Sequence, residues 1–322
     1  MSAGLDETLA RAAAVIAAAP EVALACHVTP DGDALGSMLA LHLALRAAGR
    51  DSVASFPEPF VIAEHYRGLV GLDTLTEPAA FPAAPAVMVT FDAGSIDRLG
   101  GLAGSAAAAT ELIVIDHHVS NTHFGTINVI DPNAAASGVI VRRLLDALGL
   151  PLDRGVATDL YAALICDTGR FQYESTTTEV FGLAGELASF DLEIPSLSRS
   201  LFEEHRFSYL KLMGEAVERM VLEREHGLVW TVVSQDMLAR HGCTMDEAEG
   251  LIDIVRRTRE AGVACVLKED DDGTVKVSLR SVGAVDVCAI ATANGGGGHR
   301  FAAGFTSADD VDGTLERIRA AL

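Results

Sequence analysis

The sequence predicts an α/β fold in which a parallel-sheet N-terminal domain is followed by a smaller, mixed-sheet α/β C-terminal domain. In the first half, near-continuous apolar runs at residues 22–26, 86–91 and 112–115 alternate with helix-like segments, which is typical of a parallel sheet covered on both faces. In the second half, an Asp-Gly run at 270–273 predicts a hairpin turn. With 322 residues, 49% of them hydrophobic, the chain is long enough for two cores.

A change of composition after Phe190 divides the chain. We place the first domain at 1–190, a linker with a short helix at 191–212 and the second domain at 213–322, and we expect the active site in the cleft between the domains. Helices are predicted at 5–19, 34–48, 137–148, 154–165, 246–261 and 286–293. Further strands are predicted at 51–56, 228–233, 263–267 and 274–280.

Charge and cysteine content narrow the functional class. The chain has 24 basic and 45 acidic residues, a net charge of -21, which argues against a protein that grips long nucleic acid but not against a short anionic substrate held by metal. The five cysteines form no CxxC pair, which favours reduced thiols. Asp6 and Glu7 stand where a signal peptide carries positive charge, and no apolar run would span a bilayer. We therefore expect a cytoplasmic protein without membrane contact.

Three predicted strands end on side chains that bind metals. In chain order these are His27, Asp31 and Asp33, then Asp92, then Asp116, His117 and His118. Because the carboxyl ends of parallel strands share one edge of a sheet, they predict a single site. Asp167 follows the helix at 154–165, where the helix dipole disfavours a carboxylate, so we expect a cation beside it. Two alternatives stay open: Asp33 as a helix cap, and Asp167 as an exposed loop residue.

The predicted ligands mix carboxylates with imidazoles. They are His27, Asp31, Asp33, Asp92, His117 and Asp167. This mixture suits Mn²⁺ better than Ca²⁺ or a structural Zn²⁺. Four carboxylates would balance two divalent ions, one carboxylate bridging them, and such a pair activates a water for attack on phosphorus. Asp116 would orient a neighbouring histidine ring.

The motifs resemble those of the DHH phosphoesterase superfamily, named for residues 116–118. Residues 27–37 (HVTPDGDALGS), 91–94 (FDAG) and 166–171 (CDTGRF) resemble its other motifs in the family's order, and 276–281 (KVSLRS) and 295–304 (GGGGHRFAAG) resemble the DHH-associated domain. Length and arrangement resemble the nanoRNase and pAp phosphatase group. The resemblance implies a metal-dependent hydrolase of short oligoribonucleotides, pApA and pAp, with cyclic di-AMP a further candidate. We expect two Mn²⁺ ions, no long nucleic acid as partner, and allow for a homodimer.

The resemblance also implies residue roles. His27, Asp31 and Asp92 would hold one metal; Asp33, Asp92, His117 and Asp167 would hold the other, with Asp92 as the bridge. His118 would face the scissile phosphate and stabilise charge or assist proton transfer. The catalytic set is thus His118, Asp92 and Asp116.

The oligoglycine segment of the second half predicts phosphate binding, because adjacent glycine N–H groups form an anion nest. The predicted substrate-binding residues are Arg170, Arg280, Ser281, Gly296, Gly297, Gly298 and His299. A flexible turn is the alternative interpretation.

Two other functions remain as alternatives. A manganese-dependent pyrophosphatase or polyphosphatase could use the same metal site, but it would need denser Lys and Arg in the second domain. A nucleotide-binding sensor without turnover would be favoured by a missing ligand, and the motifs lack none.

Overall fold

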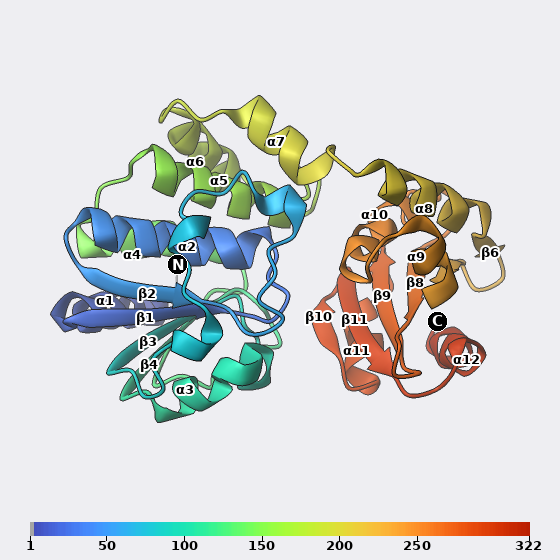
Figure 1. Cartoon of the computed structure of the whole chain (residues 1–322), viewed down its shortest axis with the longest axis horizontal. Helices are drawn as coiled ribbons and strands as arrows, with labels where there is room; N and C mark the ends of the chain where they lie inside the picture. Colours follow the sequence, from blue (N-terminus) through green and yellow to red (C-terminus); the bar gives the residue numbers. More distant parts are fainter. Residues whose placement is uncertain (1–2) are drawn as a thin grey trace. The chain divides into compact units, whose positions relative to one another are not determined.

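The computed structural model describes residues 3–322, which form two compact units, 3–204 and 205–322 (Figure 1). The segment expected to be a linker with a short helix contains helix α7 (Ile194–Phe202), in the first unit, and the start of α8 (Phe207–Glu218), in the second. Each unit has its own sheet and its own cores.

The first unit contains a parallel sheet of five strands in the order β2-β1-β3-β4-β5, which confirms the predicted fold class. The strands are β1 (Glu21–Cys26), β2 (Asp51–Ser55), β3 (Val87–Phe91), β4 (Glu111–Asp116) and β5 (Ile127–Ile130). The three apolar runs of the sequence are β1, β3 and β4, which lie side by side in register. The fifth strand, β5, was not predicted, because its four residues alternate in burial and offer no apolar run.

Helices cover both faces of this sheet (Figure 1). One face carries α1 (Ala3–Ala18), α2 (Gly32–Ala47), α4 (Ser137–Leu148) and α5 (Arg154–Asp167), whose apolar side chains form one core with the strands. The other face carries η4 (Ile96–Leu102) and α3 (Ala103–Ala108) in a smaller core. The remaining short elements are η1 (Glu64–Tyr66), η2 (Leu72–Thr74), η3 (Pro78–Ala80) and α6 (Thr178–Ala188).

Helices α2 and α5 approach closely because Gly36 lies between them. A Cβ atom at Gly36 would stand 2.4 Å from the carbonyl oxygen of Asp159. This spacing matters for the site, because α2 carries Asp33 in its first turn and α5 ends at Asp167.

The second unit contains a mixed sheet of six strands in the order β10-β11-β9-β8-β7-β6, in which only β7 and β8 are parallel. The strands are β6 (Val221–Glu223), β7 (Leu228–Val233), β8 (Val263–Glu269), β9 (Val275–Ser281), β10 (Gly297–His299) and β11 (Ala302–Ser307). The helices of this unit, besides α8, are α9 (Gln235–His241), η5 (Asp246–Leu251), α10 (Ile252–Val255), α11 (Val287–Ala293) and α12 (Val311–Ala320). A smaller mixed-sheet domain was predicted, and this is confirmed.

Two local predictions for the second unit were wrong in form. The helix predicted at 246–261 is the short pair η5 and α10. The oligoglycine segment is not an open loop: it contains β10, which pairs antiparallel with β11. A Cβ at Gly296 would stand 2.1 Å from the carbonyl oxygen of Gly304, so this glycine is required by the close approach of the two backbone segments.

Two further predictions concern the oxidation state of the cysteines and the presence of membrane-spanning helices. All five cysteines are free thiols. Among the helices of residues 3–322, none is long and apolar enough to span a bilayer.

Candidate active site and metal centre

The site lies at the carboxyl ends of β1, β3 and β4. Strand β1 is flanked by β2 on one side and β3 on the other. The chain first passes from β1 to β2 and then crosses back over β1 to β3, so the strand order reverses its direction between β1 and β3. In open α/β sheets ligands bind at such a switch point. His27 follows β1, Asp92 follows β3, and His117 follows the last residue of β4.

The first cluster joins His27, Asp31 and Asp92. His27 Nε2 lies 3.5 Å from Asp92 Oδ2 and 4.0 Å from Asp31 Oδ2. His27 Nδ1 lies 2.9 Å from the carbonyl oxygen of Val28. A metal bound beside these carboxylates would take the lone pair of Nε2, with the ring proton on Nδ1; without metal, Nε2–H donates to Asp92.

The second cluster joins Asp33, Asp92 and His117, with Asp167 beside them. His117 Nε2 lies 3.4 Å from Asp92 Oδ1, 3.7 Å from Asp33 Oδ2 and 3.0 Å from Asp167 Oδ2. His117 Nδ1 lies 3.1 Å from the carbonyl oxygen of Ala134. The same tautomer argument therefore applies to His117. All six predicted ligands thus lie in these two adjoining groups.

Asp92 is shared by both clusters. One of its oxygens faces His27 and the other faces His117. Its backbone has φ +57°, a left-handed conformation that non-glycine residues adopt mainly at turns and functional sites. Burial opposes charge on Asp92, but hydrogen bonds from His117 and His27 outweigh it and hold the pKa of this carboxyl well below its usual range.

Asp33 is fully buried and bound on several sides. Its carboxylate accepts hydrogen bonds from Ser37 Oγ at 2.9 Å and from the backbone N–H groups of Ser137 at 2.6 Å and Gly138 at 2.9 Å. The capping role belongs to Asp31 instead, whose Oδ1 accepts from the N–H groups of Asp33 and Ala34. Burial and the neighbouring Asp92 and Asp167 raise the pKa of Asp33 well above its usual value.

Asp167 is the last residue of α5, not an exposed loop residue, and the side chain facing it is the imidazole of His117. Burial lowers the pKa of His117, but hydrogen bonds to Asp167 and Asp92 raise it well above its usual value.

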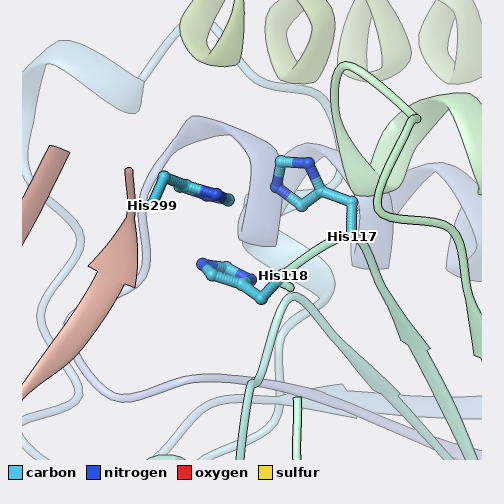
Figure 2. Close-up of side chains that lie close together, drawn as sticks. All are labelled: His117, His118 and His299. Atoms are coloured by element: carbon cyan, nitrogen blue, oxygen red, sulfur yellow. The ribbon is translucent and has the colours of Figure 1, made fainter. Parts of the chain in front are cut away.

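His118 is oriented by Asp116. Its Nδ1 lies 2.7 Å from Asp116 Oδ1 and 3.5 Å from Asp92 Oδ1. Figure 2 shows the rings of His117 and His118 leaving adjacent positions after β4; the third labelled histidine, His299, belongs to β10 of the second unit. Burial lowers the pKa of His118, but the hydrogen bond to Asp116 outweighs it and raises the pKa. The predicted pairing of Asp116 with a neighbouring ring therefore exists.

This donor set fits divalent metal ions. Asp33 and Asp92 are buried carboxylates, and their concentration of negative charge raises the pKa of Asp33. The two ligand imidazoles present Nε2 to these carboxylates, and nitrogen with carboxylate oxygen suits Mn²⁺ and its neighbours in the first transition row.

The predicted substrate-binding residues are distributed over both units. Arg170, at φ +61°, is exposed and its guanidinium lies over the ring of Phe202, 5.1 Å from the centroid. Arg280 lies on β9 and its Nε is 3.9 Å from Asp253. The hydroxyl of the buried Ser281 donates to the carbonyl oxygen of Val285 at 2.8 Å, so Ser281 has a structural role in the second unit.

The sequence analysis missed several residues that support the site. Ser137 opens α4, and its hydroxyl donates to Asp92 Oδ1 at 3.1 Å. Ser37, one turn after Asp33, and Asn121, three residues after His118, also bind site carboxylates. The sequence offered one indication of this role, namely that these residues lie close to the ligand motifs. Polar residues beside such motifs commonly orient the ligands.

Comparisons with known proteins agree with this geometry. Residues 21–164 match the DHH family, N-terminal domain, and residues 224–322 match the DHHA1 domain. The chain is 32% identical over 296 residues to the bifunctional oligoribonuclease and PAP phosphatase NrnA of Thermus thermophilus, covering 92% of this chain and 87% of that protein. The chain belongs to the DHH phosphoesterase family. Phosphoesterases of this family depend on metal, and the clusters around Asp92 are the residues of this DHH chain that fit one.

Two further likenesses widen the comparison of this DHH protein. It is 27% identical over 220 residues to the cyclic-di-AMP phosphodiesterase GdpP of Geobacillus thermodenitrificans, which covers 65% of this chain and 31% of that protein. The crystal structure of an exopolyphosphatase-related protein from Bacteroides fragilis has a TM-score of 0.89 at 22% identity, over 98% of this chain and 95% of that one. At 22% identity, the similarity to the Bacteroides fragilis protein shows a shared fold and does not assign an activity.

Proposed function

We propose that this DHH protein is a metal-dependent phosphoesterase that hydrolyses short oligoribonucleotides, pApA and pAp. The observation that carries the proposal is the position of Asp92, whose two carboxylate oxygens face two separate imidazole–carboxylate groups. A carboxylate so placed can bridge two ions. The relative NrnA of Thermus thermophilus, an oligoribonuclease and PAP phosphatase by name, supports the substrate class.

Two Mn²⁺ ions are the proposed cofactors. His27, Asp31 and Asp92 would hold one, and the other would be held by Asp92 together with Asp33, His117 and Asp167. When bound, the ions supply charge stabilisation at the phosphate oxygens and a water activated for attack on phosphorus. His118, held by Asp116, stabilises the charge that develops on the phosphate or transfers a proton to the leaving oxygen.

The second unit is proposed to bind the part of the substrate remote from the scissile phosphate. Arg280 offers a guanidinium, His299 an imidazole, and Gly297 a backbone position where an added Cβ would meet no heavy atom within 4 Å. Charge-assisted hydrogen bonds from such groups suit a second phosphate. Arg170 is proposed to assist from the first unit, since it is exposed and follows Asp167 by three residues.

The test is a side-by-side turnover assay with Mn²⁺ on pApA, pAp, cyclic di-AMP and pyrophosphate. We expect pApA and pAp to be hydrolysed fastest, and the GdpP likeness makes cyclic di-AMP the next candidate. Fastest turnover of pyrophosphate would favour a pyrophosphatase. Binding without turnover of any of the four would favour a sensor. Metal analysis of the same sample should find two ions per chain, and a single ion would contradict the bridging role of Asp92.

We also propose that the chain forms a homodimer through α8. Four of the ten large apolar side chains that are exposed in the described residues lie within 15 consecutive positions: Phe207, Leu210, Val217 and Val221. In a two-fold antiparallel pairing of α8 centred on Gly214, Leu210 and Lys211 lie opposite Glu218 and Val217 of the partner subunit. Each side chain is then within one position of its complement, Leu210 of the partner's Val217 and Lys211 of the partner's Glu218. Within residues 3–322, neither Lys211 nor Glu218 has an ion-pair partner.

Charge reversal tests this pairing. The single variants Lys211→Glu and Glu218→Lys should weaken the dimer measured by light scattering, because like charges then meet. The double variant should restore it. A protein that is monomeric at all concentrations, or a double variant that stays dissociated while the singles dimerise, would contradict the proposal.

A further inference from the structure

We propose that Asn121 is a positioning residue for the reaction, because its one side-chain amide holds both Asp116 and the backbone that follows Asp92. It thereby sets how His118 is oriented relative to Asp92. The kinetic part of this inference rests on the proposed phosphoesterase function, whereas its spectroscopic part does not.

The amide of Asn121 uses all of its polar atoms on the site. Its Nδ2 donates to Asp116 Oδ2 at 2.5 Å and to the carbonyl oxygen of Ala93 at 3.2 Å. Its Oδ1 accepts from the backbone N–H of His123 at 2.7 Å. The side chain is buried, 8% exposed, so water does not replace these bonds easily.

Asp116 depends on Asn121 for one of its two oxygens. Asp116 Oδ1 accepts from the N–H of His117 at 2.8 Å, from the N–H of His118 at 3.3 Å, and contacts His118 Nδ1 at 2.7 Å. Oδ2 accepts from Asn121. Asp116 is fully buried, and a buried carboxylate that loses its partner on one oxygen would rotate toward another donor. That rotation would weaken its hold on the His118 ring.

The contact to Ala93 reaches the other half of the site. Ala93 follows Asp92, whose left-handed backbone must be held by its surroundings. Asn121 Nδ2 binds the Ala93 carbonyl, and the neighbouring Thr122 N–H donates to the Gly94 carbonyl at 2.9 Å. One amide therefore links the loop after β3 to the end of β4. The 3.5 Å separation of His118 Nδ1 and Asp92 Oδ1 depends on this link.

The chain offers a matched control. Asn128, seven residues further on, also uses its amide on backbone groups: Nδ2 donates to the Gly125 carbonyl at 2.8 Å and Oδ1 accepts from the Gly125 N–H at 2.9 Å. None of the contacts of Asn128 reaches a site residue. Asn121→Asp and Asn128→Asp each keep the shape and the acceptor, replace the Nδ2 donor by an oxygen and add one negative charge.

The kinetic experiment compares these two variants on pApA with saturating Mn²⁺. We expect Asn121→Asp to lower kcat by about 10- to 100-fold, the usual range for residues that orient a metal site's groups, while KM changes little. Asn128→Asp should keep the kcat of the unaltered protein. Thermal melts should show similar, small losses for both. Wild-type kcat in Asn121→Asp, or an equal fall in Asn128→Asp, would overturn the proposal.

The spectroscopic experiment separates this inference from the function. In protein with ¹⁵N-labelled histidine, the ring nitrogens of His118, assigned with a His118→Gln variant, should report the proton on Nδ1. In Asn121→Asp the Nε2–H form should gain population, and in Asn128→Asp it should not. An unchanged His118 tautomer in Asn121→Asp would refute the positioning role even if the protein is active. If the unaltered protein hydrolyses no phosphoester, the proposed function fails and the tautomer still decides the role of Asn121.

Discussion

His117 Nε2 lies 3.0 Å from Asp167 Oδ2, so the end of β4 and the end of α5 meet at one pair of side chains. A carboxylate at a helix C-terminus is unfavourable by itself, because the helix dipole is negative there. Its placement is stable when positive charge is next to it. A metal ion at His117 would supply that charge, so metal binding and stability should be linked through Asp167.

Metal addition should raise the thermal midpoint of chelator-treated protein. At an ion concentration 100 times Kd, each site contributes about 2.7 kcal/mol. Asp167→Asn should reduce the Mn²⁺-induced shift, because it removes a ligand charge. Asp159→Asn is the matched control: it lies on the same helix, buried, and binds the N–H of Val70 rather than the site. An equal Mn²⁺ shift in Asp167→Asn and the unaltered protein would exclude Asp167 as a ligand.

Asp92→Asn should be the most damaging single ligand change. The substitution keeps the size of the side chain but removes the charge shared by both clusters, so activity on pApA should fall by at least about 100-fold, which corresponds to roughly 2.7 kcal/mol of transition-state stabilisation. Metal content measured in parallel should drop below two ions. Asp131→Asn, at a buried residue paired with Arg143, should retain activity. Near-normal turnover of Asp92→Asn with both ions bound would disprove the bridging role.

Variants of the second unit should act on binding rather than on chemistry. Arg280→Ala and His299→Ala should raise KM for pApA, because interactions that are equal in ground and transition states lower KM without raising kcat. A small chromogenic phosphodiester that reaches only the metals should be hydrolysed nearly as before. Equal losses on both substrates, in variants whose melts are unchanged, would mean that the second unit takes part in chemistry.

Gly36→Ala should destabilise the first unit. Its Cβ would stand 2.4 Å from a backbone oxygen of α5, and such overpacking costs about 1–3 kcal/mol. Gly185→Ala, in α6, adds the same methyl group where no heavy atom lies within 4 Å, and it should be neutral or slightly stabilising. Denaturant midpoints measure both. Equal denaturant midpoints for the two variants would show that α2 and α5 can move apart to accommodate the methyl group without a loss of folding free energy.

The free energy of unfolding should fall as the pH is lowered through the range in which His42 binds a proton in the unfolded chain but not in the folded one. This buried ring lies 2.9 Å from Ser52 Oγ, and burial, together with Arg46, lowers its pKa to about 4. Between the unfolded value of about 6.5 and 4, the unfolded chain binds a proton that the folded chain excludes, so stability is present above that window and is lost within it. The loss attributable to His42 is at most about 3 kcal/mol. In His42→Asn, urea unfolding should show a shallower decline from pH 7 to 5; an identical decline would refute the assignment.

The strongly apolar strands and their ligand-bearing ends could be predicted, because buried parallel strands need continuous apolar runs and their carboxyl ends converge. What failed depended on tertiary contacts. Strand β5 has only two buried positions, and β10 is formed of two glycines and a histidine that pair because β11 lies beside them. The left-handed backbone of Asp92 has no signature in a single sequence.

Supporting side chains were harder to predict than ligands. A serine at the start of a helix predicts a cap, yet the Ser137 hydroxyl donates to Asp92, and the first N–H groups of the helix, those of Ser137 and Gly138, are bound by Asp33. Asn121 resembles any loop asparagine until Asp116 and Ala93 are seen beside it. Their partners lie 5 to 104 residues away in the chain, and local patterns do not carry that information.

Asp31 divides its carboxylate between two tasks: Oδ1 holds the first turn of α2, and Oδ2 faces His27. Fraying of that turn removes the two N–H donors that fix the carboxylate, so the same opening event would expose the helix amides and loosen an ion held as proposed. The residence time of an ion at His27 would therefore be limited by how often one helical turn opens. Amide hydrogen exchange at Asp33 and Ala34 would then report the rate of metal release. Asp31→Ser, which can keep the cap but lacks Oδ2, should leave this exchange nearly unchanged and shorten the residence time of the ion.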